Sequence, residues 1–105
     1  MNKIDLKNKT AVVTGGAQGI GLSIAKRFLE SGASVSLWDQ DETLVNETAI
    51  KLSLIGNVEP VVMDVADLTS VENAVKHTQN VQGRIDILVC NAASNPFFGS
   101  MMDIP

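Results

Sequence analysis

Short apolar runs rich in β-branched residues alternate along this chain with longer segments of helical period, and this alternation restricts the fold more than any other feature. The runs are Thr10–Thr14, Ser34–Trp38, Val58–Met63 and Ile85–Cys90, and three helical segments separate them. Strands this apolar favour a parallel sheet, because parallel pairing needs crossover helices and those helices cover both faces of the sheet. We therefore predict one α/β domain over residues 1–105.

Each predicted helix carries its own sequence signal. The first repeats an apolar residue at every fourth position, at Ile20, Ile24 and Phe28, beside Ala25 and Leu29, which is typical of an amphipathic helix. The second opens with Asp41 as its N-cap. For the third we predict a capping box in Thr69–Glu72. Three helices therefore separate four strands.

Right-handed crossovers restrict the order of the strands in such a sheet. The simplest path runs outward from the first strand to the third and then crosses back, so that the fourth strand lies on the other side of the first. This path gives the order 3-2-1-4, a Rossmann-like, doubly wound parallel sheet with its switch point between Thr10–Thr14 and Ile85–Cys90. Ligands of such sheets bind beyond the carboxyl ends of the strands, at that point.

Composition excludes several classes of function. The formal net charge is -4 and the Lys and Arg residues are scattered singly, so the chain lacks the basic stripe that neutralises a nucleic-acid backbone. The apolar runs are too short to span a bilayer, and the start lacks the apolar core of a signal peptide. Cys90 is the only cysteine, which excludes an internal disulfide and a cysteine-based zinc site. We expect a cytoplasmic protein that binds no nucleic acid, no membrane and no metal.

The segment TGGAQGIG, residues 14–21, follows the first strand and opens the first helix. Backbone N–H groups at a helix N-terminus attract phosphate, and glycines let the phosphate come close. As a nucleoside-triphosphate loop the segment fails, because Leu22 stands where the phosphate-gripping lysine is required. If the segment binds a pyrophosphate, we expect Gly15 to turn the chain, Gly19 to admit the phosphate and Gly21 to allow close packing of the helix. The alternative is a glycine-rich turn that serves only the fold.

An acidic residue, Asp39, follows the second strand near the spacing at which a carboxylate meets the ribose of a bound adenosine. Such a carboxylate accepts hydrogen bonds from the ribose hydroxyls and repels a 2′-phosphate. Gln18 in the loop is neutral, and residues 40–42 add no cation. We therefore expect NAD in preference to NADP, and the alternative is a plain turn carboxylate.

Polar and small residues also follow the third and fourth strands. Asp64 can accept a hydrogen bond from an adenine amino group, and the backbone of Val65 can meet the ring; a helix-capping or turn role is the alternative for Asp64. After the fourth strand, Asn91, Ala92 and Ala93 leave room for a ribose. Asn91 can equally well tie the two middle strands together.

TGGAQGIG after the first strand, Asp39 after the second, Asp64-Val65 after the third and NAA after the fourth together resemble the short-chain dehydrogenase/reductase family, over essentially the whole chain. The resemblance implies pyrophosphate binding at Gly15, Gln18, Gly19, Ile20 and Gly21, ribose binding at Asp39, adenine contacts at Asp64 and Val65, and cofactor or scaffold roles for Asn91, Ala92 and Ala93. It also implies hydride transfer between nicotinamide and a small alcohol or carbonyl substrate, and a homo-oligomer at full length. Ser94 departs from the glycine that family members usually have there.

The chemistry of that family uses a Tyr-x-x-x-Lys pair, and this sequence contains no tyrosine. His77 stands apart from every cofactor motif. We therefore predict no catalytic residue and no activity for residues 1–105 alone, and we expect the cofactor-binding N-terminal part of a truncated dehydrogenase. The alternative is a stand-alone, non-catalytic dinucleotide-binding module.

Overall fold

The computed structural model describes residues 5–91, which form strands and helices in strict alternation. The elements are β1 (Thr10–Thr14), α1 (Gly19–Glu30), β2 (Ser34–Asp39), α2 (Glu42–Leu52), β3 (Val58–Val62), α3 (Leu68–Gln82) and β4 (Ile87–Cys90). All strand pairs are parallel, in the order β3-β2-β1-β4. The predicted α/β fold and strand order are confirmed. Within the described part, none of the helices combines the length and the apolar character that a membrane crossing requires.

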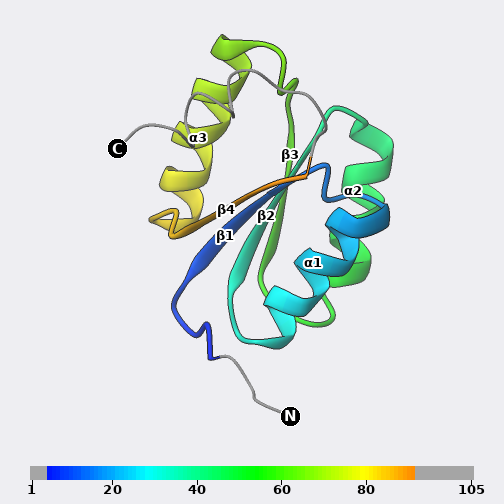
Figure 1. Ribbon diagram of the computed structural model, residues 1–105, viewed down its shortest axis with the longest axis vertical. Helices are drawn as coiled ribbons and strands as arrows, with labels where there is room; N and C mark the ends of the chain where they lie inside the picture. Colours follow the sequence, from blue (N-terminus) through cyan, green and yellow to red (C-terminus); the bar gives the residue numbers. More distant parts are fainter. Residues whose placement is uncertain (1–4, 92–105) are drawn as a thin grey trace.

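Two apolar cores, one on each face of the sheet, hold the layers together. The helices α1 and α2 cover one face and α3 covers the other (Figure 1). Side chains alternate between these faces along the strands, so that Val13 and Leu37 pack with α1 and α2, whereas Val12 and Trp38 pack with α3. Burying each such side chain stabilises the fold by about 1.5–3 kcal/mol. β1 and β2 are therefore the centre of the domain.

The strand register aligns the carboxyl ends of the four strands. Thr14 pairs with Trp38 on one side and with Cys90 on the other, and Trp38 pairs with Val61. The pairing continues past the end of β1, where the N–H of Gly15 donates to the carbonyl oxygen of Trp38 at 2.7 Å. The loops that carry the predicted site residues therefore emerge next to one another.

α1 buries Ala25 and Leu29, which the sequence places beside the apolar period, whereas the residues of the period itself are more exposed. Gly21, Ala25 and Leu29 are its buried residues, whereas Ile20 is 72% exposed and the rest of the period is only partly buried. The small residues Gly21 and Ala25 let the helix backbone come close to the strands, and larger side chains at these two positions would hold it away.

The cap of α3 also differs from the prediction. Its N-cap is Asp67, whose Oδ1 accepts hydrogen bonds from the N–H groups of Thr69 at 3.0 Å and Ser70 at 3.4 Å. The predicted capping box in Thr69–Glu72 is wrong, because Thr69 lies inside the first turn, where its own N–H needs a partner. Gly83 follows the helix with φ 87°, a left-handed conformation that suits glycine.

A charged hydrogen bond anchors the amino ends of β1 and β4. Asp86 Oδ2 accepts from the N–H of Thr10 at 2.9 Å, and the N–H of Asp86 donates to the Thr10 carbonyl at 2.8 Å. The guanidinium of Arg84 donates from Nε to Asp86 Oδ1 at 2.8 Å. The hydrogen bond from Thr10, supported by the nearby charges of Arg84 and Lys9, lowers the pKa of Asp86 below its ordinary value of 3.8.

Asp86→Asn tests this anchor, because it removes the charge and keeps an oxygen that accepts from Thr10. The folded-state pKa lies below the unfolded-state value, so the carboxylate stabilises the fold fully above pH 3.8, and this stabilisation is lost as the pH falls through the folded-state pKa. We expect the variant to melt at a lower temperature than the wild type at neutral pH, and the difference to disappear in strong acid. Thermal melts over a pH series measure it. Glu47→Gln, on the exposed side of α2, is the matched control, and a difference that is constant with pH would contradict the prediction.

Candidate cofactor-binding site

A cavity of about 150 Å³ lies at the carboxyl ends of β1, β2 and β3. Its lining residues are Gly15, Trp38, Asp39, Gln40, Met63 and Val65. Three of the predicted site residues, Gly15, Asp39 and Val65, thus come together from the ends of three separate strands. The strand register brings them there, because the carboxyl ends of parallel strands meet at one edge of the sheet.

No side chain of the described residues caps the N-terminus of α1. Its N-cap, Gln18, makes no side-chain capping bond, and the first turn of the helix contains no acidic residue. The carboxylates of Asp41 and Asp67, in contrast, cap α2 and α3. Gln18, Gly19 and the side chain of Ile20 are all exposed. The first-turn N–H groups of α1 therefore present a partial positive charge that suits an anion.

The three predicted glycines have separate structural reasons. Gly15 and Gly19 adopt left-handed conformations, with φ 63° and 62°. A Cβ at Gly19 would meet no atom within 4 Å, so the space beside it is open. A Cβ at Gly21 would overlap the carbonyl oxygen of Gly15 and lie 2.8 Å from Nδ2 of Asn91. The geometry thus matches the predicted turn at Gly15 and close packing at Gly21, and it leaves room for a phosphate at Gly19.

Two backbone N–H groups orient the carboxylate of Asp39. Oδ1 accepts from the N–H of Asp41 at 3.1 Å, and Oδ2 accepts from the N–H of Ala17 at 3.4 Å. The side chain is half-buried beside the cavity. Each carboxylate oxygen can accept a further hydrogen bond. The geometry therefore leaves acceptors for the hydroxyls of a ribose, as the sequence predicts.

Asp64 takes the turn role that the sequence left open as an alternative. Its Oδ1 accepts from the N–H of Ala66 at 2.9 Å, and its own N–H donates to Oγ of Ser70 at 2.9 Å. Its side chain is exposed and is not among the residues that line the cavity. The contact between Asp64 and adenine stays a prediction.

Asn91 connects the end of β4 to the glycine loop. Its Nδ2 donates to the carbonyl oxygen of Gly15 at 3.4 Å, and its N–H donates to Oγ1 of Thr14 at 2.9 Å. The scaffold role that the sequence allowed for Asn91 is therefore present. Ala92 and Ala93 lie outside the described residues, and their predicted roles stay predictions.

Sequence reasoning missed three residues that shape the loop. Thr14 bonds to Asn91, as described above. Gly16 is buried, and a Cβ there would lie 2.8 Å from Cδ2 of Leu37, so only glycine fits. The glycine cluster was the sequence signal that could have marked this position. Thr48 on α2 donates from Oγ1 to the carbonyl oxygen of Ala17 at 2.9 Å. No local signal marks Thr48, because its partner is distant in the sequence.

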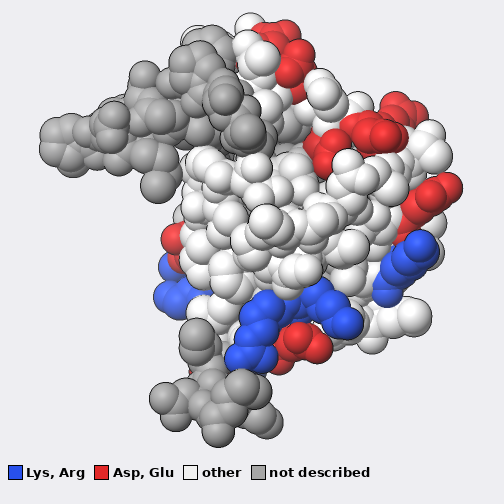
Figure 2. All heavy atoms as spheres, turned by 45° about the vertical axis from the view of Figure 1, so that its right-hand side comes forward, with Lys and Arg blue, Asp and Glu red and all other residues white. Residues whose placement is uncertain are grey.

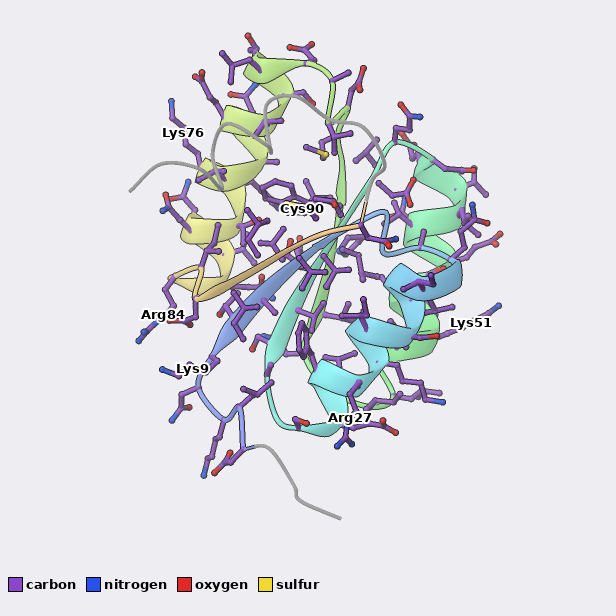
Figure 3. All side chains as sticks on the ribbon, viewed as in Figure 1. Lys9, Arg27, Lys51, Lys76, Arg84 and Cys90 are labelled. Atoms are coloured by element: carbon purple, nitrogen blue, oxygen red, sulfur yellow. The ribbon has the colours of Figure 1, made fainter. Side chains whose placement is uncertain are left out.

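Acidic side chains gather at the edge of the sheet that holds the cavity. Figure 2 shows Asp and Glu mainly in the upper part of the face and Lys and Arg mainly in the lower part, with an uncharged surface between them. Asp39, Asp41 and Glu42 follow one another closely at this edge, and residues 15–18, 40–41 and 63–67 contain no Lys or Arg. Arg27 and Lys51 point outward at the lower and right-hand sides of the molecule (Figure 3). The loops next to Asp39 therefore carry negative charge and no cationic side chain.

Other reactive side chains lie away from the cavity lining. His77 Nε2 lies 3.2 Å from Oε1 of Glu59, with about half of the imidazole side chain exposed. Burial raises the pKa of the Cys90 thiol, so that it stays protonated at neutral pH. Among residues 5–91, no three His, Cys, Asp or Glu side chains are grouped to hold a metal ion.

Residues 9–103 match the sequence pattern of the family described as short chain dehydrogenase. The chain belongs to this family. It is 41% identical to dehydrogenase/reductase SDR family member 4 of Oryctolagus cuniculus over 100 residues, which are 94% of this chain and 38% of that protein. It is also 41% identical to a 3alpha-hydroxysteroid dehydrogenase of Mediterraneibacter gnavus over 93 residues, which are 83% of this chain and 36% of that protein.

Solved structures of the short-chain dehydrogenase type share the fold. The L-sorbose reductase of Gluconobacter frateurii, solved with NADPH and L-sorbose, superimposes with a TM-score of 0.84 at 34% sequence identity. The superposition covers 89% of this chain and 36% of the reductase. The chain thus spans a little over a third of the length of these relatives. The residues of this chain that match the family include the glycine loop and Asp39.

Gly21→Ala tests the close approach of α1 to the loop. The added methyl group would overlap the Gly15 carbonyl, so the helix must move away, and we expect the free energy of unfolding to fall by about 1–3 kcal/mol. Urea denaturation measures the change. Lys26→Ala, at an exposed position on the same helix, is the control, with an expected change within about 0.5 kcal/mol. Equal denaturation midpoints for Gly21→Ala and the wild type would show that the contact is not required.

Proposed function

We propose that this chain is the dinucleotide-binding part of an NAD-dependent oxidoreductase that transfers hydride between nicotinamide and a small alcohol or carbonyl substrate. The observation that carries the proposal is the open N-terminus of α1, which follows the loop at the end of β1 and comes close to Asn91 at the end of β4; Gly15 of this loop lines the same cavity as Asp39. Membership of the short-chain dehydrogenase family supports the reaction class. Because the chain covers 38% of its relative, the activity is proposed for the whole protein.

The residues present fit a pyrophosphate. The first turn of α1 offers N–H donors that no described side chain caps. Gly19 leaves the approach to them open, since a Cβ at that position would meet no atom within 4 Å. We assign the pyrophosphate to the loop of Gly15, Gln18, Gly19, Ile20 and Gly21. Two phosphate charges are stabilised there by the positive end of the helix dipole.

The adenosine half fits beside Asp39. We assign the ribose hydroxyls to the oxygens of Asp39 that the N–H groups of Ala17 and Asp41 already orient. The adenine enters the cavity that Met63 and Val65 line. A 2′-phosphate on the ribose would lie next to the Asp39 carboxylate, in loops without a cation, and this supports NAD as the preferred cofactor.

The nicotinamide, when bound, accepts or supplies the hydride. The residues described here bind the dinucleotide and fix its orientation at the carboxyl edge of the sheet. Oxidation of an alcohol also releases a proton from the substrate oxygen, and the family resemblance assigns that transfer to a Tyr-x-x-x-Lys pair. The 105 residues contain no tyrosine, so we assign none of them to proton transfer.

Gly19→Ala tests the pyrophosphate assignment. We expect the affinity for NAD to fall by about tenfold or more, because the methyl group occupies the approach to the N–H donors. Gly83→Ala is the matched control, since Gly83 also has a positive φ and open space around it but lies at the end of α3. Both variants should lose similar stability, and only the first should lose affinity. Isothermal titration calorimetry that gives equal NAD affinities for the two variants would refute the assignment.

Asp39→Asn tests the cofactor preference. The amide keeps an acceptor and removes the negative charge that repels a 2′-phosphate. We expect the wild type to bind NAD more tightly than NADP, and the ratio of the two dissociation constants to narrow by about tenfold in the variant. Asp64→Asn removes a charge from the same edge and should leave the ratio unchanged. Equal wild-type affinities for NAD and NADP would contradict the preference.

A further inference from the structure

The backbone at Ala17 is held from two sides by side chains of other elements. Oγ1 of Thr48 on α2 donates to its carbonyl oxygen at 2.9 Å, and Oδ2 of Asp39 accepts from its N–H at 3.4 Å. Thr48 is 6% exposed and Ala17 is 1% exposed, so water does not substitute for the threonine hydroxyl. The two bonds fix the peptide groups on both sides of Ala17.

Thr48 occupies a buried position in its helix. It lies among the buried residues of α2, beside the apolar Val45, Ala49 and Leu52. Hydroxyl residues inside or at the end of helices commonly bond to a carbonyl of the preceding turn, as Ser23 does with Gly19 and Ser53 does with Ile50. Thr48 bonds instead across to the glycine loop. A valine would have nearly the same shape there, so packing alone does not require the hydroxyl.

The direction of this bond determines where the next N–H points. In a planar trans peptide the C=O and the N–H point in opposite directions. The carbonyl of Ala17 points toward α2, so the N–H of Gln18 in the same peptide group points away from α2. Gln18 is the N-cap of α1, and the uncapped first turn follows it. Thr48 therefore orients the peptide group that immediately precedes the first turn of α1, whose N–H groups we assign to the phosphates.

We propose that Thr48 is a positioning residue for the pyrophosphate loop. It contacts neither the dinucleotide nor the reacting atoms, and it acts through the carbonyl of Ala17. The inference deepens the proposed dinucleotide function and rests on it. Asp39 accepts a hydrogen bond from the N–H of Ala17. Ala17 therefore connects the residue assigned to the ribose with the loop assigned to the pyrophosphate.

A positioning role predicts selectivity between two ligands. NAD carries the pyrophosphate, whereas adenosine carries only the ribose and the base. Thr48→Val removes the hydroxyl and keeps the shape of the side chain. We expect this variant to bind NAD about fivefold or more weakly than the wild type, with adenosine affinity changed less than about twofold. Thr48→Ser keeps a donor and should restore the wild-type NAD affinity.

The experiment measures NAD and adenosine affinities of the full chain by NMR titration, for the wild type, Thr48→Val and Thr48→Ser. Thr78→Val is the matched control: Thr78 is also a buried helical threonine, and its Oγ1 lies 3.2 Å from Oγ of Ser36 and accepts from Nε1 of Trp38 at 3.3 Å. Trp38 lines the cavity assigned to the adenosine, which both ligands carry, so any effect through Trp38 acts on both affinities alike. This control should lose stability without a change in the ratio of the two affinities. If valine at position 48 prevents folding, Thr48→Ala tests the same ratio.

Three results would overturn the inference. A Thr48 variant that lacks the hydroxyl and binds NAD like the wild type would exclude a role in loop positioning. Equal losses for NAD and adenosine would show that Thr48 acts only on overall structure. A wild-type protein that binds no NAD would refute the proposed function itself, whereas normal wild-type binding with an unchanged ratio in the variant would refute only the role of Thr48.

Discussion

The parallel pairing of β1 with β2 on one side and β4 on the other is the constraint on which the rest of this structure depends. β1 is fully buried by its neighbours and by the helices on both faces. Its register places Thr14 in one row with Trp38 and Cys90, so the residues just beyond these three are neighbours as well. Because the chain leaves β2 and β4 on opposite sides of β1, none of the described helices covers the carboxyl end of β1, and Gln18 and Gly19 of the glycine loop are exposed there.

The same topology brings the helix N-termini to one edge of the sheet, since each helix follows the carboxyl end of a strand (Figure 1). Two of them are neutralised by the carboxylates of Asp41 and Asp67. The third, at α1, has no such cap among the described residues, and the half-buried Asp39 stands one loop away. A positive helix end beside a fixed carboxylate distinguishes the two parts of an adenosine diphosphate. In the proposed function the helix end is assigned to the phosphates and the carboxylate to the sugar hydroxyls.

Local signals predicted much of this arrangement, and their failures have a common cause. The cap at Asp41 and the turn at Gly15 depend on a few neighbouring residues, and the structure shows both. In α1 the period alone does not show which of its apolar residues are buried: Ala25 and Leu29 are buried and Ile20 is exposed, because the sheet requires close approach of the helix at Gly21. The cap of α3 was placed on the wrong residue, because either Asp67 or Thr69 satisfies a local capping pattern and only the path of the preceding loop decides between them.

The sequence by itself determined the alternation of strands and helices, the parallel sheet, the location of the glycine loop and the acidic residue after the second strand. Each of these follows from periodicity or from the conformational freedom of single residues, which are local properties. Only the tertiary structure decided that Asn91 supports Gly15, that Asp39 is oriented by the N–H of Ala17, and that a threonine on α2 holds the carbonyl of the same residue. These bonds join residues of different elements. Their existence depends on how closely helices and strands approach each other, and that distance is set by the packing of the whole core.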